Sequence, residues 1–560
     1  NYEQRNYAQS VSDYNQAIRL RPNDADTYYN RGVTYEHFNN QYDLAIADYN
    51  QAISLNPQMA DAWGNRGRLR NEQGDHQTAM ADLNRALSIR ENAVDLHNRG
   101  QVYYDMHDYA HAMPDYNRAI VLDGANADYV NDRGNAYYGL EDYAHAMEDY
   151  NHAIALDGNS AIYYRNRGLV YSAQHDYPKA IADYEVAIRL EPNRAESYVS
   201  RGIARTHLND TAGAIADYTT ALGLDPNRQT AYYNRGLAYY DQGDYQRAIA
   251  DYNEAIRRDA NDGDAFNERG NSYYMLQDYD HAMADYNESL RLHPNNAITL
   301  RNRGLILEAR HDAAGAIAAY TASINADPQY ASSYLSRGSA YYDQGNYAAA
   351  ISDADAAARI DGGNWRAPSN AGDAYLAQHN YQQAIAAYTR SITLASHQVW
   401  NYTHRASAYL GLNDAAHANA DYALAVQQVS ATSQEENNDL CWTLATSGQG
   451  LDAARIVCDR AVTLAAGTPN AANNLDSRGM LNLKTSRFQD AWNDYDAAAR
   501  AEPTHASYFY GRGIAALRLG RTADGQSDIA HATQLDANIA ATYARNGVAA
   551  DGTIGAPPAH

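Results

Sequence analysis

The chain has 560 residues, and its 68 acidic side chains outnumber its 44 basic ones, which gives a formal net charge of -24. Binding to nucleic acid or to an anionic membrane surface depends on clustered basic residues, so this balance argues against both kinds of partner. No apolar run approaches the roughly 20 residues that a membrane-spanning helix needs, and no membrane span is expected.

Residues 1–20 carry the apolar spacing of one helical face, with Tyr7, Tyr14 and Ala17 in line. Further along the chain the same set recurs in the second helix of a helix pair. Residues 1–20 are therefore predicted to be an N-terminal half repeat that contains the second helix only. Such a half repeat exposes an apolar face, and such faces rarely stay open.

Residues 21–426 repeat one pattern in phase. Its most regular marker is a small residue that recurs every 34 residues, at Gly100, Gly134, Gly168, Gly202, Gly236, Gly270, Gly304, Gly338 and Gly372. A fixed period of this length is typical of stacked supersecondary units rather than of one globular core. We expect a regular array of such units over this range.

Each unit is predicted to be a pair of helices. In one copy, Tyr232, Gly236 and Tyr239 share a helical face, and Tyr252 lies on the face of a second helix. Gly243 separates the two halves and suits a tight turn. The small residue lets the helices approach closely, and the tyrosine fills the space beside it.

These residues resemble the tetratricopeptide repeat family, in the form of a long array of the bacterial type. Its aromatic, small and alanine positions correspond here to Tyr232, Gly236, Tyr239, Ala248, Tyr252 and Ala255. The resemblance implies an all-α fold: an α-solenoid, a right-handed superhelix of about 15 helix-turn-helix repeats with a half repeat at the N-terminus and a cap helix at the C-terminus. It also implies a concave groove, without implying a particular ligand.

The phase of the repeat breaks after residue 426. Residues 427–437 are polar and are predicted to be an extended connection between repeats. Residues 438–536 return to the repeat pattern and contain both cysteines. Residues 537–549 are predicted to form a capping helix, which solenoids need at an exposed end, and 550–560 a disordered tail.

The two cysteines are candidates for a disulfide. If Ala445 and Ala454 are the small residues of one helix pair, Cys441 lies four residues before the first and Cys458 four after the second. In antiparallel helices both displacements lead to the same end, so the thiols should face each other. The alternative is two reduced thiols in an apolar interface. A disulfide would favour a periplasmic or extracellular location over the cytoplasm, and two cysteines alone provide too few ligands for a metal site.

An arginine precedes most repeat glycines, and an aspartate precedes many of the core tyrosines. The antiparallel argument places the two at similar height, where bidentate pairs would fix the geometry of each repeat. The alternative is a row of arginines that lines the groove and holds anionic partners. The central members of this structural ladder are Arg133, Arg167, Arg201, Arg235 and Arg269 with Asp149, Asp183, Asp217, Asp251 and Asp285.

Groove-facing positions follow by analogy with the family. They lie three residues before and one, four and five residues after each small residue. Family members that clamp a carboxylate use Lys and Arg there, whereas this lining is polar, acidic and aromatic and suits a basic peptide or a carbohydrate better. The candidates are Tyr29, Asn131, Asn135, Tyr138, Tyr233, Tyr240, Asp241, Asn267, Asn271, Tyr274, Tyr342 and Asp343.

The sequence contains no nucleophile, phosphate-loop or zinc-protease motif, so neither catalysis nor a cofactor is expected. The leading hypothesis is a non-enzymatic scaffold that binds a protein or peptide segment in its groove. A second is a structural protein that assembles with itself head to tail through residues 1–20, because heterologous contacts that do not close form filaments. A third is an extracellular protein that binds or carries glycans.

Overall fold

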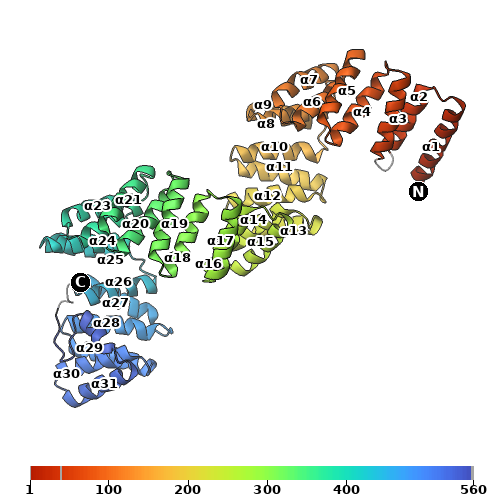
Figure 1. Cartoon of the computed structure of the whole chain (residues 1–560). Coiled ribbons are helices and arrows are strands. Elements are labelled where there is room, and N and C mark those ends of the chain that lie inside the picture. Colours follow the sequence, from red (N-terminus) through yellow and green to blue (C-terminus); the bar gives the residue numbers. More distant parts are fainter. Residues whose placement is uncertain (1, 38–40, 556–560) are drawn as a thin grey trace. The chain divides into compact units, whose positions relative to one another are not determined.

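The computed structural model describes residues 2–37 and 41–555, with side chains from residue 7 onward. These residues form 32 helices. Their only β-type pairing is an isolated antiparallel bridge between Val548 and Ile554. The chain divides into two compact units, residues 1–278 and 279–560. The molecule is an all-α solenoid, as the repeat pattern predicts (Figure 1).

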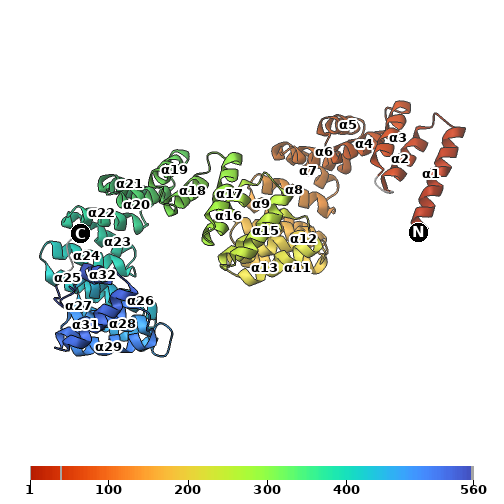
Figure 2. The ribbon, with the colours of Figure 1, turned by 60° about the horizontal axis from the view of Figure 1, so that its bottom comes forward.

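The first unit holds sixteen helices, and after α1 they follow one another as helical hairpins (Figure 2). Even-numbered helices are the first helix of a hairpin and odd-numbered ones the second. The bounds are α1 Tyr2–Leu20, α2 Ala25–His37, α3 Tyr42–Leu55, α4 Ala60–Glu72, α5 His76–Ile89, α6 Ala93–Asp105, α7 Tyr109–Leu122, α8 Ala127–Gly139, α9 Tyr143–Leu156, α10 Ala161–Ala173, α11 Tyr177–Leu190, α12 Ala195–His207, α13 Thr211–Leu224, α14 Gln229–Asp241, α15 Tyr245–Arg258 and α16 Gly263–Met275.

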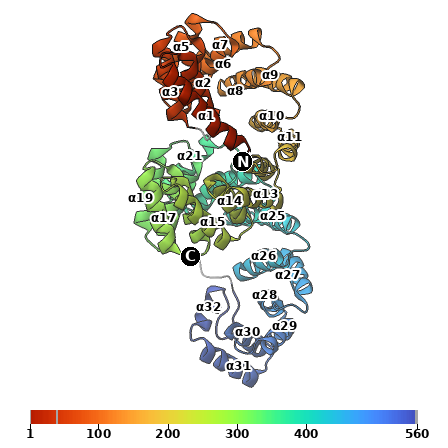
Figure 3. The same ribbon diagram turned by 90° about the vertical axis from the view of Figure 1, so that its right-hand side faces the viewer.

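The second unit continues the alternation and ends with a short helix beside α30 (Figure 3). Its bounds are α17 Tyr279–Leu292, α18 Ala297–Ala309, α19 Ala313–Ala326, α20 Ala331–Asp343, α21 Tyr347–Ile360, α22 Arg366–Ala377, α23 Tyr381–Leu394, α24 Val399–Gly411, α25 Ala415–Gln428, α26 Gln434–Ser447, α27 Leu451–Ala465, α28 Ala471–Lys484, α29 Phe488–Ala501, α30 Ala506–Arg518, α31 Thr522–Leu535 and α32 Ile539–Arg545.

In most of the hairpins whose turn the structure describes, the turn is built from a left-handed residue followed by a helix cap. Gly243 has φ of 77°, a conformation that glycine adopts without steric cost. The side chain of Asp244 then accepts a hydrogen bond of 3.1 Å from the backbone N–H of Arg247, which satisfies one free donor of the second helix. The same Asp cap recurs in most hairpins and fixes where the second helix begins.

The core of a hairpin is a tyrosine ring that packs against a glycine. Tyr252 is fully buried, and a Cβ atom added to Gly236 would lie 2.7 Å from its Cε1 atom. Ala248 and Ala255, one turn to either side of the ring, are also fully buried. Because interiors are close-packed, the glycine is required by the close approach of the helices, as the sequence pattern indicates.

The Arg and Asp residues of the predicted ladder lie between the two helices of each hairpin. Arg133, Arg167, Arg201 and Arg235 each donate from Nε and Nη2 to the two carboxylate oxygens of Asp149, Asp183, Asp217 and Asp251, over 2.6 to 2.9 Å. The fifth pair, Arg269 and Asp285, has one residue in each unit, and its pairing stays a prediction.

The ladder also joins neighbouring repeats. Nη1 of Arg133 donates to Oδ1 of Asn117 on α7 over 2.8 Å, and Nη1 of Arg167 donates to Asn151 on α9 over 2.7 Å. Each of these arginines therefore holds both helices of its own hairpin and the second helix of the preceding one. The arginines serve the packing between hairpins.

Three predicted boundaries need correction. The connection predicted over 427–437 is shorter, because Ser433 caps α26 and the helix already begins at Gln434. The predicted cap helix, 537–549, is helical only over Ile539–Arg545. The tail predicted to be disordered from 550 is ordered up to Gly555, whose carbonyl accepts a hydrogen bond of 2.8 Å from Nζ of Lys484. Residues 556–560 lie outside the described residues.

Candidate functional site

The first helices of successive hairpins form one continuous face in each unit, which we call the inner face. Contacts between first helices of neighbouring repeats, such as α8 with α10 and α14 with α16, recur through both units. Among the described residues, contact between consecutive second helices is prominent only for α25 and α27. The first helices therefore lie closer together, which places them on the inside of the curve. Most of the predicted groove residues lie on this face.

The core tyrosines deliver their hydroxyl groups to the inner face. The hydroxyl of Tyr150 donates to Oδ1 of Asn135 over 2.8 Å, and that of Tyr388 donates to Asp373 over 2.7 Å. In these two hairpins the ring packs in the core while the hydroxyl reaches its edge and finds a partner. Side chains one residue after the repeat glycine are thereby held in place.

The acidic and aromatic part of the inner face in the first unit centres on Glu268 of α16. Its carboxylate accepts hydrogen bonds from Nδ2 of Asn267 over 3.0 Å and from Nδ2 of Asn271 over 2.9 Å. Burial raises the pKa of Glu268, and the negative charges of Asp264 and Asp241 raise it further. Among the described residues, Glu268, Asp264 and Asp241 form no ion pair, so no paired cation balances the negative charge around Glu268.

Tyr233 and Tyr240 of α14 provide the aromatic part of this cluster. The ring of Tyr233 lies 6.0 Å from that of Tyr252, and the ring of Tyr240 lies 5.3 Å from that of Tyr245. The buried hydroxyl of Tyr252 has no hydrogen-bond partner in the described structure. An unpaired buried hydroxyl is costly, and this one lies beside the Glu268 carboxylate, whose charge raises the pKa of Tyr252. We call Tyr233, Tyr240, Asp241, Asp264 and Glu268 the Glu268 cluster.

Two predicted groove residues are buried instead of lining an open surface. Asn131 is 2 % exposed and Asn267 is 5 % exposed. Nδ2 of Asn131 donates to Asp132, and its Oδ1 accepts from Nδ2 of Asn166 on α10, both over 3.0 Å. The reason for the correction is the close packing of first helices, which covers the position three residues before the glycine when its side chain is short.

Where a Tyr-Tyr pair lies near the end of a first helix, its second tyrosine can be only half open to the inner face. The ring then packs against the tyrosine that begins the second helix, with ring centroids 5.6 Å apart for Tyr138 and Tyr143 and 5.4 Å apart for Tyr342 and Tyr347. Tyr342 remains 36 % exposed. Tyr29, Asn135, Asn271 and Tyr274 are half-buried, whereas Asp241 and Asp343 are exposed.

Glu268 and Asp132 were missed by the groove prediction, which omitted the position two residues before the repeat glycine. Asp132 accepts hydrogen bonds from Asn135 over 3.1 Å and contacts Nε2 of His97 at 2.7 Å. The available signal was an acidic residue at a position where asparagine is the most frequent residue, as at Asn166 and Asn234. An acid there changes the charge of the inner face.

The two cysteines are joined in the second unit. Sγ of Cys441 on α26 lies 1.98 Å from Sγ of Cys458 on α27, and the Cα atoms are 4.9 Å apart. Both side chains are fully buried. The disulfide crosses a hairpin whose turn departs from the common pattern, with left-handed glycines at Gly448 and Gly450.

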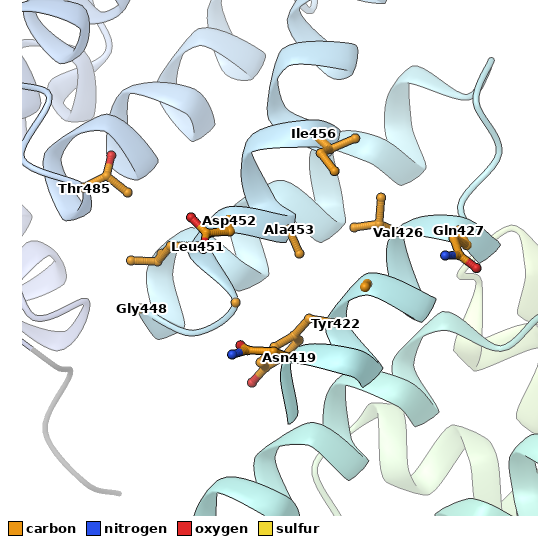
Figure 4. A pocket seen from close by; sticks show the side chains of 12 residues that line it. Asn419, Tyr422, Val426, Gln427, Gly448, Leu451, Asp452, Ala453, Ile456 and Thr485 are labelled. Carbon is orange, nitrogen blue, oxygen red and sulfur yellow. The ribbon is translucent and has the colours of Figure 1, made fainter. Parts of the chain in front are cut away.

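That altered turn leaves a hollow of about 730 Å³ between α25 and α27. Figure 4 shows Tyr422, Val426, Leu451 and Ile456 around it, with Asn419 at its edge. The ring of Tyr422 lies only 2.6 Å from where a Cβ of Gly450 would be, so the turn rests on the ring. The lining is mostly apolar and holds no buried charged group, so the hollow offers little to orient a ligand.

Four models of the tetratricopeptide repeat match the chain. Three of them are described as "Tetratricopeptide repeat". The first matches residues 38–94, 233–297, 301–364 and 477–525. The second matches residues 167–232, and the third matches residues 96–126 and 369–398. One described as "TPR repeat" matches residues 1–37 and 134–175. No curated protein matches the chain.

Many solved structures share the helical architecture at low identity. The Cut9–Hcn1 complex of APC/C is 16 % identical with a TM-score of 0.42, over 86 % of this chain and 94 % of that one. Yeast Tom70 is 16 % identical with a TM-score of 0.38, and the match covers 80 % of this chain and 97 % of the Tom70 chain. YrrB, described as a TPR protein with an unusual peptide-binding site, is 20 % identical with a TM-score of 0.30. The match covers 33 % of this chain and 95 % of the YrrB chain.

The sequence models match in phase over most of the chain, and the hairpins, the small residue under the tyrosine ring and the inner face agree with them. The chain belongs to the tetratricopeptide repeat family.

Proposed function

We propose that the inner face of the first unit binds a basic segment of a partner protein at the Glu268 cluster. Proteins of this family commonly mediate protein-protein interaction and are generally non-enzymatic. The observation that carries the proposal is the gathering of Asp241, Asp264 and Glu268 among tyrosine rings, with no cation of the described chain to balance them. Lys or Arg side chains of a partner would supply that balance and stack on the rings.

The same features favour a peptide over a carbohydrate. Asn267 and Asn271 spend their donors on Glu268, which leaves the carboxylate oriented and the amides engaged. A sugar would be recognised by free amide donors and acceptors, whereas a positive charge needs only the oriented carboxylates. In the described chain, residues 2–37 and 41–555, no helix has the length and apolar character required for crossing a membrane.

Head-to-tail assembly through residues 1–20 is the rival function. At the other end of the chain, α32 covers the last hairpin, with Ile539 and Tyr543 buried at 5 % and 1 % exposure. Because α32 already covers the apolar face of the last hairpin, that face is not available to pack against the half repeat of a second molecule. This observation favours partner binding over self-assembly.

The test is fluorescence anisotropy with a labelled lysine-serine nonapeptide as the probe, in low and in moderate salt. Glu268→Gln should weaken binding at least about fivefold, because it removes a charge-assisted contact worth about 1 kcal/mol or more. The matched control is Glu148→Gln, which makes the same change on the exposed side of α9 and should leave binding unchanged.

Three results would contradict the proposal. A glutamate-serine nonapeptide that binds equally well would show that charge is not recognised. Equal effects of Glu268→Gln and Glu148→Gln would place the binding elsewhere. An apparent molar mass from light scattering that grows with protein concentration in the absence of peptide would favour self-assembly.

A further inference from the structure

A second hollow, of about 430 Å³, opens on the inner face of the second unit near its C-terminal end. It lies between α28, the start of α30 and the short helix α32, which lies beside α30 (Figure 3). Its walls combine apolar and aromatic side chains with a few polar groups. The lining residues used below are Trp442, Asp476, His505, Ser507, Ile539 and Tyr543.

The buried carboxylate of this hollow is that of Asp476, which is 5 % exposed. It accepts hydrogen bonds from the hydroxyl of Ser507, over 3.0 Å to Oδ1 and 3.1 Å to Oδ2. Nearby aspartates of the same unit are paired with arginines, Asp494 with Arg478 over 2.7 Å and Asp528 with Arg512 over 2.7 Å. Over the described part of the chain, Asp476 forms no ion pair.

A buried carboxylate that has only a neutral donor is costly when it is ionised. Burial accordingly raises the pKa of Asp476 to about 7. The groups that face it are Tyr495 of α29, Tyr508 of α30 and Tyr543 of α32, with His505 and Asp536 in the wall of the hollow. Burial raises the pKa of the three phenols above the ordinary value, so they stay neutral and offer Asp476 no countercharge.

We propose that this hollow binds the primary ammonium group of a ligand, with its aliphatic stem against Trp442 and Ile539. An ammonium group would supply the missing countercharge, and its three donors match the two carboxylate oxygens and the Ser507 hydroxyl oxygen. Trp442 provides an aromatic face of the kind that attracts cations.

The donor set excludes a metal ion as the occupant. Calcium takes six to eight oxygen ligands, and the hollow presents only the carboxylates of Asp476 and Asp536 with a few hydroxyl and amide groups. Among the described residues, no group of three or more His, Cys, Asp or Glu side chains is arranged to hold a metal. The apolar walls instead fit the hydrocarbon part of an alkylamine or of a lysine side chain.

The site arises from two unusual residues at one position of the repeat, and it does not involve the Glu268 cluster. Trp442 and Asp476 occupy the same position in successive first helices, three residues before the small residues Ala445 and Gly479. Most copies place a tyrosine, an asparagine or another uncharged residue there. The exchange to Trp and Asp in neighbouring repeats, under the cover of α32, creates a combination found in no other pair of neighbouring repeats.

The test is isothermal titration of the full chain with hexylamine, with hexanol as the uncharged probe of equal length. Hexylamine should bind about tenfold more tightly at pH 8 than at pH 6, because a carboxyl with a pKa of about 7 is about ten times more ionised there. At pH 7, binding should release about half a proton, measured as the dependence of the heat on the ionisation enthalpy of the buffer.

Asp476→Asn should abolish hexylamine binding while keeping the fold, since the amide mimics the neutral carboxyl and can still accept from Ser507. The matched control is Asp524→Asn on the exposed side of α31, which should bind like the wild type. His505→Gln removes the histidine from the wall of the hollow, and hexylamine binding to this variant should keep the pH dependence of the wild type.

Each remaining outcome overturns the proposal. Hexanol binding as tightly as hexylamine would make the hollow a merely apolar pocket. Hexylamine binding to Asp476→Asn with unchanged affinity would move the contact elsewhere. Absence of binding to a wild-type chain whose circular dichroism is that of a folded helical protein would show that Asp476 has only a structural role.

Discussion

The arginine-aspartate ladder predicts a local and measurable loss of stability when one carboxylate is removed. In the hairpin of α14 and α15, Arg235 donates to both oxygens of Asp251, over 2.7 Å and 2.8 Å, and its third donor contacts Oγ1 of Thr219 on α13 over 3.0 Å. Side-chain exposure is 17 % for the arginine and 8 % for the aspartate. The variant Asp251→Ala would strand a largely buried guanidinium.

The expected magnitude follows from these contacts. Hydrogen bonds to charged groups contribute about 1.5–3 kcal/mol each, but the exposed part of Arg235 regains water and its bond to Thr219 remains. We therefore expect a net loss of about 2–3 kcal/mol, below the full cost of breaking a completely buried pair. Because each repeat of a solenoid contacts only its neighbours, the loss should concentrate in α13 to α16.

Hydrogen exchange followed by mass spectrometry is the suitable assay, since it resolves local opening in a chain that need not unfold in two states. A loss of about 2–3 kcal/mol corresponds to exchange that is about 30- to 150-fold faster in the peptides of α14 and α15. The matched control is Asp241→Ala on the same hairpin, where the side chain is exposed and the expected change is below about 0.5 kcal/mol.

A further variant distinguishes a stranded charge from simple loss of contact. Arg235→Met combined with Asp251→Leu removes both charges, and more than half of the lost protection should return. The reasoning is refuted if Asp251→Ala exchanges no faster than Asp241→Ala. It is equally refuted if the double variant is less protected than the single one.

Four other changes test the core, the disulfide and the buried carboxyl. Tyr252→Phe should leave stability unchanged or raise it by about 1 kcal/mol, because the buried hydroxyl of Tyr252 has no partner, whereas Tyr150→Phe should lower it by about 1 kcal/mol through the lost bond to Asn135. Exchange protection of α9 and α15 compares the two, and equal effects would contradict the assignment. Reduction of the Cys441–Cys458 disulfide, which closes a loop with a sequence separation of 17, should cost about 3 kcal/mol in α26 and α27, and unchanged protection of these helices after reduction would show that the bond does not constrain them. The raised pKa of Asp476, about 7 against an ordinary value of 3.8, favours the folded state fully below about pH 4, and this contribution is lost as the pH rises through 7. Asp476→Asn should therefore gain stability over the wild type between pH 5 and pH 8 in thermal melts, and a pH-independent difference would contradict the shift.

The sequence by itself determined the repeat, its two helices and their packing. Residues such as Gly236 and Tyr252 recur in phase, and a small residue opposite a large ring has one close-packed solution, which is the hairpin observed. Antiparallel geometry sufficed to predict that Arg235 and Asp251 lie at the same height, and the same reasoning singled out Cys441 and Cys458. These relations are local, spanning a single hairpin, so the spacing along the chain carries them.

Only the tertiary structure decided which side chains of the inner face are accessible and which of them meet. Asn131 and Asn267 were expected in the groove, but neighbouring first helices cover them. Glu268 lies at a position that the groove prediction omitted. Asp264 of its own helix α16 and Asp241 of the neighbouring first helix α14 both raise its pKa, and only the packing of the two helices brings Asp241 near. The hollow at Asp476 exists because α32, far along the chain, closes over α30. Such features depend on how closely one repeat packs against the next. The spacing of residues within a repeat does not determine the distance between neighbouring repeats.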